Sequence, residues 1–568
     1  MQHNQVVRVA MVPGSHQSGL VGMVGEDGTP EGPAQEVSDL AAAVTELERA
    51  GDVRWIWPSS ARLYPDLLRA GARVARCHDI ELTGSLIRAR DQDQAEPPAI
   101  SAAAARLAAA TAAWGSHTRE QLLFAGDEAA PVDPRCAWTD VVDVHAHQVA
   151  RIAADPHPAK FGLLAAAESA GGLAAAEMTA AGLPWRADVH DRLLTEVLGP
   201  RPPATAGPPL RPTRLAELAA QISETLGAVR PVNLDSPVQL LRALAASGVR
   251  VSSTRTSVLR QVDHPVIPLL LEYKELARLN SANGWSWLDT WVSGGRFRPE
   301  YVVGGVVSGR WASRGGGALQ IPRLLRQAVI ADPGWTLVVA DAAQLEPRIL
   351  AALAGDRAFA QTAMSGDLYE AVAAAIGGER KTAKVALLSA MYGGMGGDGG
   401  RSLALLRRRF PQASAFVERA ARAGEEGQVV RSVLGRTCPL PSAAWLSLTA
   451  DSVDPDEDRD PGAGAAARAR GRFTRNFVVQ ASAADWAQVL LATLRNSLAE
   501  MSAPDLGQPH LVFFQHDEVI VHSPAEKADE VVAAIDAAAL TATSLVFGAT
   551  AVTFPMATAV VDCYSGAK

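Results

Sequence analysis

Two apolar stretches, far apart in the chain, each lead into acidic residues, and this pairing constrains the fold more than any other feature. Residues 337–340 are apolar and are followed by Asp341. Residues 511–514 are also apolar and are followed, after one glutamine, by residues 516–518, which read His-Asp-Glu. Short apolar stretches of this kind are typical of buried strands. If the two strands are neighbours, Asp341 and Asp517 meet at the strand ends and can hold two divalent metal ions over a phosphoryl group.

A segment between these acids carries four side chains at helical spacing. Arg380, Lys384, Leu388 and Tyr392 each lie four positions apart. In a helix this spacing keeps them on one face over about 18 Å. That face has two cations at one end and an aromatic ring at the other, which matches the phosphates and the flat base of a nucleoside triphosphate. A charged stripe alone usually marks a solvated helix face, so the nucleotide interpretation depends on all three elements together.

The three segments together resemble the motifs of DNA polymerase family A, the DNA polymerase I group. Residues 341–348 resemble the first palm motif of that family, residues 380–393 its fingers helix and residues 516–518 its second palm motif. Flanking segments agree at residues 233–240, 309–313, 319–322, 326–328 and 472–485. The resemblance extends over roughly residues 165–565.

Some positions depart from the family pattern. Leu388 stands where the best-known members have phenylalanine or tyrosine, Ala343 stands in place of a serine, and Pro347 stands where leucine is usual. Together with a compact glycine-rich segment at residues 393–400, these departures resemble an actinobacterial branch described as bifunctional 3′–5′ exonuclease and DNA polymerase. Because Leu388 removes an aromatic edge from the sugar pocket, discrimination against chain terminators does not follow from the motif.

The resemblance implies an α+β multidomain protein with the right-hand arrangement of a polymerase. It has an antiparallel palm sheet, helical fingers and a helical thumb, preceded by an N-terminal α/β exonuclease-like domain. We expect an exonuclease-like domain over 1–160, connecting helices with the thumb and the start of the palm over 161–330, the first palm segment over 331–365, the fingers with an insertion over 366–470, and the second palm segment over 471–568.

The resemblance also implies a two-metal mechanism. Asp341, Asp517 and the backbone carbonyl of Ala342 are the expected ligands of two Mg²⁺ ions, for which Mn²⁺ can substitute. Glu518 is expected to orient the site without bridging the ions, although a surface acid in a hairpin is the simpler alternative. Lys384 is the candidate acid that protonates pyrophosphate as it leaves.

Further side chains are expected to bind the nucleotide. Arg380 and Lys384 hold the triphosphate, while Leu388 and Tyr392 lie nearer the sugar and base. Glu346 excludes a ribose 2′-hydroxyl, which favours deoxynucleotides. The resemblance places Gln344 at the same pocket. Tyr369 lies where the family often has a histidine on the triphosphate, and a phenol can donate one hydrogen bond there but no charge.

Another group is expected to contact primed template DNA near the primer terminus and the minor groove, where hydrogen-bond acceptors common to all base pairs allow reading without sequence preference. Each of these residues, taken singly, is as compatible with an ordinary helix or strand position. The group consists of Arg310, Gln320, Arg472, Asn476, Gln480 and His516.

The N-terminal domain lacks the acids that a proofreading exonuclease needs on its first strand. Residues 8–12 contain no carboxylate, whereas two-metal exonucleases carry Asp-x-Glu there. Asp79, Glu81, Asp140 and Asp143 remain as candidate remnants, and Thr139 stands where a tyrosine is expected. We therefore expect a structural domain without exonuclease activity.

Composition places few limits on function. The net charge of −8 does not indicate a nucleic-acid binder, but phosphate binding depends on where the cations lie, and arginines cluster at residues 323–326, 407–409 and 468–472. The acidic segment 451–467 is expected to be an exposed loop because it fits no calcium-binding spacing.

The chain is expected to be a cytoplasmic monomer without a membrane segment. No apolar run approaches the length of a bilayer span. Four cysteines are widely spaced and are expected to be free thiols in a reducing compartment; they are Cys77, Cys136, Cys438 and Cys563.

Two other functions compete with a template-directed DNA polymerase. A single-subunit RNA polymerase shares the palm acids and the fingers helix, but Glu346 argues against ribonucleotides. A catalytically silent DNA-binding repair scaffold would keep the polymerase shape and lose a palm acid or a fingers cation. All of these residues are present, which favours the enzyme.

Overall fold

A computed structural model describes most of the chain and divides it into two compact units. The described residues are 6–14, 17–92, 95–114, 133–203, 210–314, 320–364, 366–393, 399–450, 461–501 and 507–567. The first unit contains Met1–Ala181, Glu300–Ala312 and Val338–Val560, and the second contains Gly182–Pro299, Ser313–Leu337 and Val561–Lys568. Most of the glycine-rich segment 393–400 and of the acidic segment 451–467 lies outside the described residues.

The first unit begins with a five-stranded mixed sheet, ordered β3-β2-β1-β4-β5. Strand β1 pairs in parallel with β4 and antiparallel with β2, while β4 pairs in parallel with β5. Because side chains alternate along a strand, β1 contributes to two cores. Val9 and Met11 face a core shared with α1 and α2, while Ala10 and Val12 face a core shared with α4 and α5. The bounds are β1 (Val7–Pro13), β2 (Gly19–Met23), β3 (Gln35–Val37), α1 (Leu40–Ala50), β4 (Val53–Trp57), α2 (Ser60–Arg69), β5 (Arg76–Asp79), α3 (Ile80–Arg90), α4 (Pro98–Trp114) and α5 (Pro134–Ala153).

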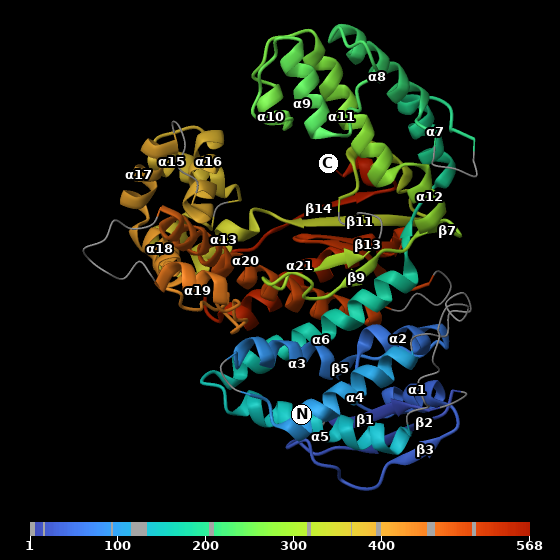
Figure 1. Cartoon of the computed structure of the whole chain (residues 1–568). Helices are drawn as coiled ribbons and strands as arrows, with labels where there is room; N and C mark the ends of the chain where they lie inside the picture. Colours follow the sequence, from blue (N-terminus) through green and yellow to red (C-terminus); the bar gives the residue numbers. More distant parts are fainter. Residues whose placement is uncertain are drawn as a thin grey trace. The chain divides into compact units, whose positions relative to one another are not determined.

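A second sheet in the chain has four strands, ordered β12-β13-β11-β14 (Figure 1). Strands β12 and β13 form an antiparallel hairpin. Strand β13 is buried along its whole length, and helices α6, α20 and α21 pack around this hairpin. The bounds are α6 (Pro158–Ala181), β11 (Trp335–Ala342), α20 (Pro461–Glu500), β12 (His510–Gln515), β13 (Glu518–Pro524), η3 (Ala525–Lys527), α21 (Ala528–Phe547) and β14 (Met556–Val561).

Helices fill the part of the first unit between β11 and α20. The predicted helix over 380–392 is confirmed as α16, which buries alanine and leucine on one side. Helix α18 packs along α20, and α16 packs between α15 and α17. The bounds are α13 (Leu345–Ala354), α14 (Arg357–Thr362), α15 (Leu368–Ile376), α16 (Arg380–Tyr392), α17 (Gly399–Arg409), α18 (Pro411–Glu425) and α19 (Ala443–Ala450).

The second unit is mainly helical and has its own apolar core. Leucines at helical spacing on α8, α9 and α11 form this core together with Tyr273 and Trp285. A small sheet, ordered β6-β8-β7, completes the unit. The bounds are β6 (Leu183–Pro184), α7 (Ala187–Leu198), α8 (Thr213–Thr225), α9 (Pro237–Ala246), α10 (Thr256–Leu259), α11 (Val266–Asn283), α12 (Trp285–Trp291), β7 (Val292–Ser293), β8 (Arg296–Phe297), η2 (Arg323–Ala328) and η4 (Tyr564–Gly566). A separate two-stranded sheet pairs β9 (Glu300–Val302) with β10 (Ala312–Arg314).

Two of the expected domain boundaries fall inside continuous helices. The boundary at residue 160 lies in the first turn of α6, and the boundary at residue 470 lies within α20. When a helix continues through a domain boundary, no change in amino-acid composition marks that boundary in the sequence. The remaining divisions stay predictions.

Two helices in the described part of the chain are long and apolar enough to cross a membrane. They span Gly462–Glu500 and Ala525–Phe547. The expectation that no segment has this character was too strict, because alanine-rich helices of a protein core pass the same test. In the first helix 83% of the apolar window is buried inside the protein, which is typical of a core helix.

A buried ionic cluster joins three separate parts of the first unit. Arg436 donates to Glu168 of α6 at 2.6 Å and to Asp485 of α20 at 3.2 Å. Gln488 of α20 also donates to Glu168, at 2.6 Å. Burial lowers the pKa of Arg436, but the two carboxylates outweigh it and raise the pKa above its usual value. The guanidinium therefore stays charged and holds both acids inside the protein.

The same cluster fixes a short loop that follows β9. Gly304 and Gly309 both have positive φ, 61° and 82°. A Cβ atom on Gly304 would lie 2.4 Å from a carboxylate oxygen of Glu168, and one on Gly309 would lie 2.3 Å from Nε of Arg436. Both positions therefore require glycine. The loop ends at Arg310, so the cluster fixes the backbone position from which the Arg310 side chain extends.

A second buried network joins α2 and α6 to α20. Arg495 of α20 donates to Glu177 of α6 at 3.0 Å and to the carbonyl of Ala75 at 2.7 Å. Tyr64 of α2 donates its hydroxyl to the same Glu177 at 2.7 Å. This network attaches the N-terminal sheet and its helices to the long helix of the same unit.

Removing Arg436 tests the first cluster. Arg436→Met leaves Glu168 and Asp485 buried without their cation, so we expect the free energy of unfolding to fall by about 3–5 kcal/mol. Arg407→Met is the control, because its ion pair with Glu418 is exposed to solvent and contributes less than about 1 kcal/mol. Urea denaturation followed by circular dichroism measures both. Equal losses in the two variants would show that the buried cluster has no special importance.

Candidate functional site

The two palm acids lie on neighbouring segments of the four-stranded sheet. Asp341 lies at the end of β11, and Asp517 lies in the turn between β12 and β13. The backbone N–H of Ala342 donates to the carbonyl oxygen of Asp517 at 2.9 Å. Strand β13, which follows Asp517, lies between β12 and β11 in the sheet, so the two strands that precede the acids are not direct neighbours as expected. The structure therefore brings these two distant acids side by side.

Tight backbone turns surround both acids. His516 has a φ of 56°, and Asp517 donates its N–H to Gln515 at 2.7 Å, which closes the turn between β12 and β13. Gln344, three residues after Asp341, has a φ of 55°. Left-handed backbone costs non-glycine residues about 1 kcal/mol or more and is concentrated at functional sites.

Oxygen atoms dominate the donors at this place. Asp341 and Asp517 supply carboxylates, and Ala342, which directly follows Asp341, supplies a backbone carbonyl. Glu518, the first residue of β13, is buried. The described residues contain no group of three or more histidine, cysteine or acidic side chains arranged to hold a metal. Mg²⁺ commonly uses only one or two carboxylates and takes its remaining ligands from water and phosphate, so this donor set fits Mg²⁺.

Glu346, in the first turn of α13, joins two other parts of the site. Its carboxylate accepts a hydrogen bond from the guanidinium of Arg310 and another from the hydroxyl of Tyr392. Burial raises the pKa of the Tyr392 phenol, and the neighbouring Glu346 raises it further. Three residues predicted separately from the sequence therefore form one contact group.

His516 lies close to this group. Burial lowers the pKa of its imidazole, Arg310 lowers it further, and Glu346 acts in the opposite direction. The ring is therefore neutral near pH 7. A neutral ring can both donate and accept hydrogen bonds.

The fingers helix presents its two cations to solvent. Arg380 forms an ion pair with Asp367 at 2.8 Å, and Lys384 is exposed. Both cations lie over the ring of Tyr369, at 5.6 Å and 5.7 Å from its centre. Asp367 caps the N-terminus of α15 by accepting from two backbone N–H groups. The aromatic ring of Tyr369 therefore lies beneath both cations.

The other predicted nucleotide-binding residues lie on two helices. Leu388 of α16 is partly exposed on the same face as Arg380 and Lys384. Gln344 turns its side-chain oxygen toward α15, where it accepts from the N–H of Leu368 at 2.8 Å. In this structure the Gln344 amide thus stabilises the start of a helix.

Arg348 is a buried cation for which no role was predicted from the sequence. Its guanidinium donates to four backbone carbonyls, at Ala343, Ala363, Gly366 and Thr553, over 2.5–3.1 Å. These carbonyls come from the turn after β11, from the segment before α15 and from the segment before β14. One signal was visible in the sequence, because an arginine on the apolar face of α13 needs partners inside the protein.

Helix α20 carries three of the expected DNA-binding residues at helical spacing. Arg472 is exposed, and Asn476 and Gln480 are partly exposed on the same side. The side-chain oxygen of Asn476 is buried without a hydrogen-bond partner among the described residues. A Cβ atom on Gly393, at the end of α16, would lie 3.1 Å from Arg472, so the ends of this stripe and of the fingers helix are close together. Gln320 belongs to the second unit and is exposed there.

The acids expected as exonuclease remnants are engaged in local structure or exposed. Asp79 is buried, caps α3 through the N–H of Leu82 at 2.9 Å and accepts from the N–H of Ser60 at 2.6 Å. Burial raises its pKa to about 6. Asp140 pairs with Arg106 at 2.5 Å, while Glu81 and Asp143 are exposed.

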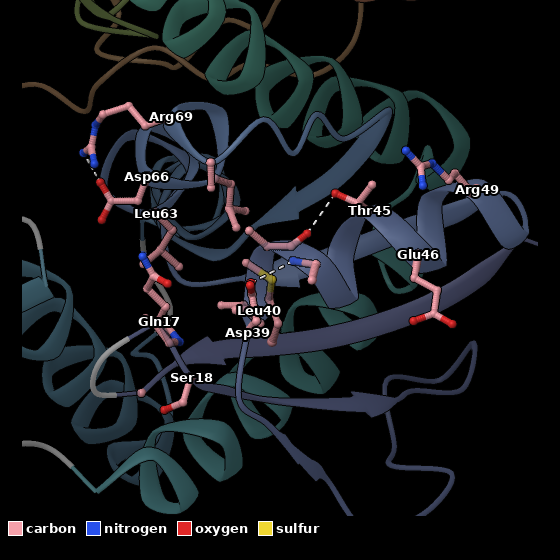
Figure 2. A pocket seen from close by; sticks show the side chains of 17 residues that line it. Gln17, Ser18, Asp39, Leu40, Thr45, Glu46, Arg49, Leu63, Asp66 and Arg69 are labelled. Carbon is pink, nitrogen blue, oxygen red and sulfur yellow. Dashed lines mark hydrogen bonds and ion pairs between the residues drawn. The ribbon is translucent and has the colours of Figure 1, made fainter.

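One cavity of the first unit lies apart from these residues. It has a volume of about 1060 Å³ and lies between the end of β1, α1 and α2. Leu40 and Leu63 contribute to its apolar floor, and charged side chains such as Glu46 and Arg69 lie around it (Figure 2). Its lining includes none of the residues predicted for catalysis, nucleotide binding or DNA binding.

The four cysteines are free, as expected. Cys77 and Cys438 are buried, Cys563 is partly exposed and Cys136 is exposed.

Comparisons with known proteins identify relatives of the chain. The family model described as DNA polymerase family A matches residues 211–548. A thermostable DNA polymerase I of Thermus aquaticus is 25% identical over 361 residues, which cover 56% of this chain and 40% of the relative. DNA polymerase I of Deinococcus radiodurans is 30% identical over 185 residues, which cover 28% of this chain and 19% of the relative. The chain thus aligns with less than half the length of these curated relatives.

A solved structure has the same fold. The POL domain of Pol1 from M. smegmatis, in complex with DNA primer-template and dNTP, superimposes with a TM-score of 0.70 at 19% sequence identity. The match covers 100% of this chain and 96% of that chain. At this identity the likeness supports the fold alone. Because the family model matches more than half of its residues, the chain belongs to DNA polymerase family A.

Proposed function

We propose that this chain is a DNA-directed DNA polymerase, which adds deoxynucleoside triphosphates to the 3′-hydroxyl of a primer. The observation that carries the proposal is the backbone contact between Ala342 and Asp517, which places two acids from distant segments side by side. Membership of the family supports the same activity. The expected partners are primed template DNA and deoxynucleoside triphosphates, and we expect a monomer in the cytoplasm, where free thiols persist.

Asp341, Asp517 and the carbonyl of Ala342 would hold two Mg²⁺ ions, and Mn²⁺ accepts the same oxygen donors. The bound ions supply activation of the primer hydroxyl and neutralise charge on the departing pyrophosphate. Glu518, buried beside them, orients the turn that carries Asp517.

Arg380 and Lys384 bind the triphosphate. Their exposure and their positions over Tyr369 leave both cations open to an incoming anion. Arg380 is held by Asp367 in this structure, so the triphosphate competes with that carboxylate for the guanidinium. Lys384 also donates a proton to pyrophosphate as it leaves. Tyr369 attracts both cations to its ring and so keeps them near each other at the start of α16.

Glu346 excludes ribonucleotides from the sugar pocket. Its carboxylate is held between Arg310 and Tyr392, so it cannot rotate freely away from an incoming sugar. A 2′-hydroxyl would meet this fixed carboxylate and be left poorly paired. Leu388 and Tyr392 line the remaining side of the pocket, with Gln344 supporting α15 behind it.

Primer and template bind along α20 and the loop that carries Arg310. Arg472, Asn476 and Gln480 form a polar stripe on one side of α20. His516 and Arg310 contribute donors next to the paired acids. Gln320, on the second unit, is a further candidate for contact with DNA.

Primer extension tests the catalytic proposal. Asp517→Ala removes one of the two acids, and we expect the extension rate to fall by about a thousandfold or more, which corresponds to about 4 kcal/mol of transition-state stabilisation. Asp529→Ala, an exposed acid on α21, is the matched control and retains full activity. Equal extension by the Asp517→Ala and Asp529→Ala variants, or no extension by the parent, would refute the proposal. Primer-independent synthesis from ribonucleotides would favour an RNA polymerase.

Nucleotide competition tests the role of Glu346. We expect Glu346→Ala to raise ribonucleotide incorporation relative to deoxynucleotide incorporation by about 10- to 100-fold, because an unpaired buried polar group costs roughly 1–3 kcal/mol. Tyr392→Phe removes only the hydroxyl that bonds Glu346 and keeps the carboxylate in place. Discrimination is therefore retained in that variant. If Tyr392→Phe relaxes discrimination as much as Glu346→Ala does, the carboxylate acts only through the tyrosine.

We also propose that the N-terminal domain lacks proofreading activity. The first-strand positions that face α4 and α5 are Ala10 and Val12, both completely buried in an apolar core. Asp79 and Asp140 have partners that contribute to folding. The domain therefore has no pair of acids on the first strand with which to hold metal ions.

A nuclease assay with single-stranded DNA and either Mg²⁺ or Mn²⁺ tests this proposal. We expect no metal-dependent shortening from the 3′ end by the Asp517→Ala variant. The Asp143→Asn variant, at an exposed acid, controls for loss of folding. Shortening that persists in Asp517→Ala and disappears in Asp79→Ala or Asp143→Asn would show an active exonuclease site.

A further inference from the structure

Three arginines lie opposite one another on adjacent strands of the N-terminal sheet. Arg8 of β1 is in register with Arg54 of β4, and Arg54 is in register with Arg76 of β5. The three strands are parallel neighbours, so successive arginines are only about 4.8 Å apart along the row. These residues are called the arginine row below.

The three side chains lie on one face of the sheet. Arg54 precedes Ile56 by two positions, and Ile56 belongs to the core shared with α4 and α5. Arg8 precedes Ala10 of the same core in the same way. Arg76 precedes His78, whose ring packs against His145 of α5 at 4.7 Å. Arg8 and Arg54 lie near enough to His145 of α5 to lower the pKa of its imidazole.

The outer members of the row have acidic partners. Arg8 reaches Glu26 at 3.4 Å, but the glutamate side chain is 78% exposed. Arg76 pairs with Asp52 at 2.9 Å, with both side chains partly exposed. Such exposed pairs contribute little to stability.

The central member has no such partner. Within the described residues the Arg54 side chain makes no hydrogen bond and no ion pair, although the residue is partly buried. Burial lowers the pKa of its guanidinium, and Arg76 and Arg8 lower it further, against smaller opposing effects of Cys77 and Asp52. The neighbouring imidazoles are uncharged near pH 7, because burial lowers the pKa of His78 to about 4 and that of His145 to about 2.

This arrangement costs the fold stability. Like charges directly opposite one another in a sheet are unfavourable. A partly desolvated guanidinium without an acceptor adds a further cost. Val53 and Trp55, on either side of Arg54, face the opposite core and gain nothing from the charge. An anion bound across the row would remove both costs.

We propose that the arginine row binds the oxygen atoms of a phosphate group. Three planar guanidiniums at strand spacing present paired N–H donors to one tetrahedral anion or to two successive phosphates. The chemistry is that of binding alone, because the adjoining strand positions, Ala10 and Ile56, carry no acid or nucleophile. A nucleic-acid backbone and free phosphate or pyrophosphate both offer this group. The row lies in the N-terminal sheet and involves no residue of the proposed polymerase site, so the two proposals can fail separately.

Thermal denaturation with and without inorganic phosphate, at matched ionic strength, tests the site in the full chain. A ligand that binds only the folded protein raises the midpoint. We expect phosphate to raise the midpoint of the parent and of Arg69→Gln, and to leave that of Arg54→Gln unchanged. Arg69 is the matched control because it lies on α2 in an exposed pair with Asp66. Without phosphate, Arg54→Gln is expected to unfold at the same or a higher temperature than the parent, because repulsion in the row is relieved.

Binding of a single-stranded oligonucleotide as a function of salt distinguishes the source of the phosphate. If the row binds nucleic-acid backbone, Arg54→Gln reduces the slope of the logarithm of affinity against the logarithm of salt concentration by about 1, while Arg69→Gln leaves it unchanged. A phosphate-dependent midpoint with an unaltered slope assigns the site to free phosphate. If Arg54→Gln is too unstable to measure, Arg8→Gln replaces it in both experiments. Identical behaviour of the row variant and Arg69→Gln in both experiments overturns the proposal.

Discussion

The hydrogen bond from Ala342 to Asp517 is the contact on which the rest of the candidate site depends. It joins the end of β11 to the turn after β12, so two acids from opposite ends of the polymerase segment meet at one place. A shift of one residue between these strands would turn an acid to the opposite face of the sheet. The left-handed backbone at Gln344 and His516 stores strain at both exits, and the buried strand β13 prevents its relaxation.

Buried cations form the frame around this contact. Arg436 binds Glu168 and Asp485, while Arg348 binds four carbonyls near the first acid. A buried charge tolerates little change in geometry, because every lost hydrogen bond leaves a polar group without water. The two cations of α16, Arg380 and Lys384, are by contrast exposed. A rigid acidic centre beside accessible cations is the arrangement that charged-group transfer requires.

Periodic or apolar sequence patterns predicted individual helices and strands. Contacts between distant segments had no such pattern and could not be predicted in this way. The spacing of Arg380 to Tyr392 predicted a helix over those residues, and the apolar run before Asp341 predicted its strand. The pairing of Glu346 with Arg310 and Tyr392 was not predictable, because the three residues lie on separate segments with no shared period. The cluster around Arg436 was not predictable for the same reason. The sequence also did not predict that α6 continues through the expected domain boundary at residue 160 and α20 through the one at residue 470.

The first strand of the N-terminal sheet carries apolar residues at positions where a two-metal exonuclease would carry acids. Acids on the first strand would face the core of α4 and α5, where two close carboxylates repel each other unless metal ions neutralise them. Ala10 and Val12 replace that repulsion by apolar packing, which stabilises the domain without a ligand. Arg495 of α20, the helix that carries the polar stripe proposed for DNA, attaches the same domain by donating to the carbonyl of Ala75 at 2.7 Å. Loss of the domain would therefore leave Arg495 without this acceptor and Glu177 of α6 without the hydroxyl of Tyr64, which gives selection a physical reason to keep it.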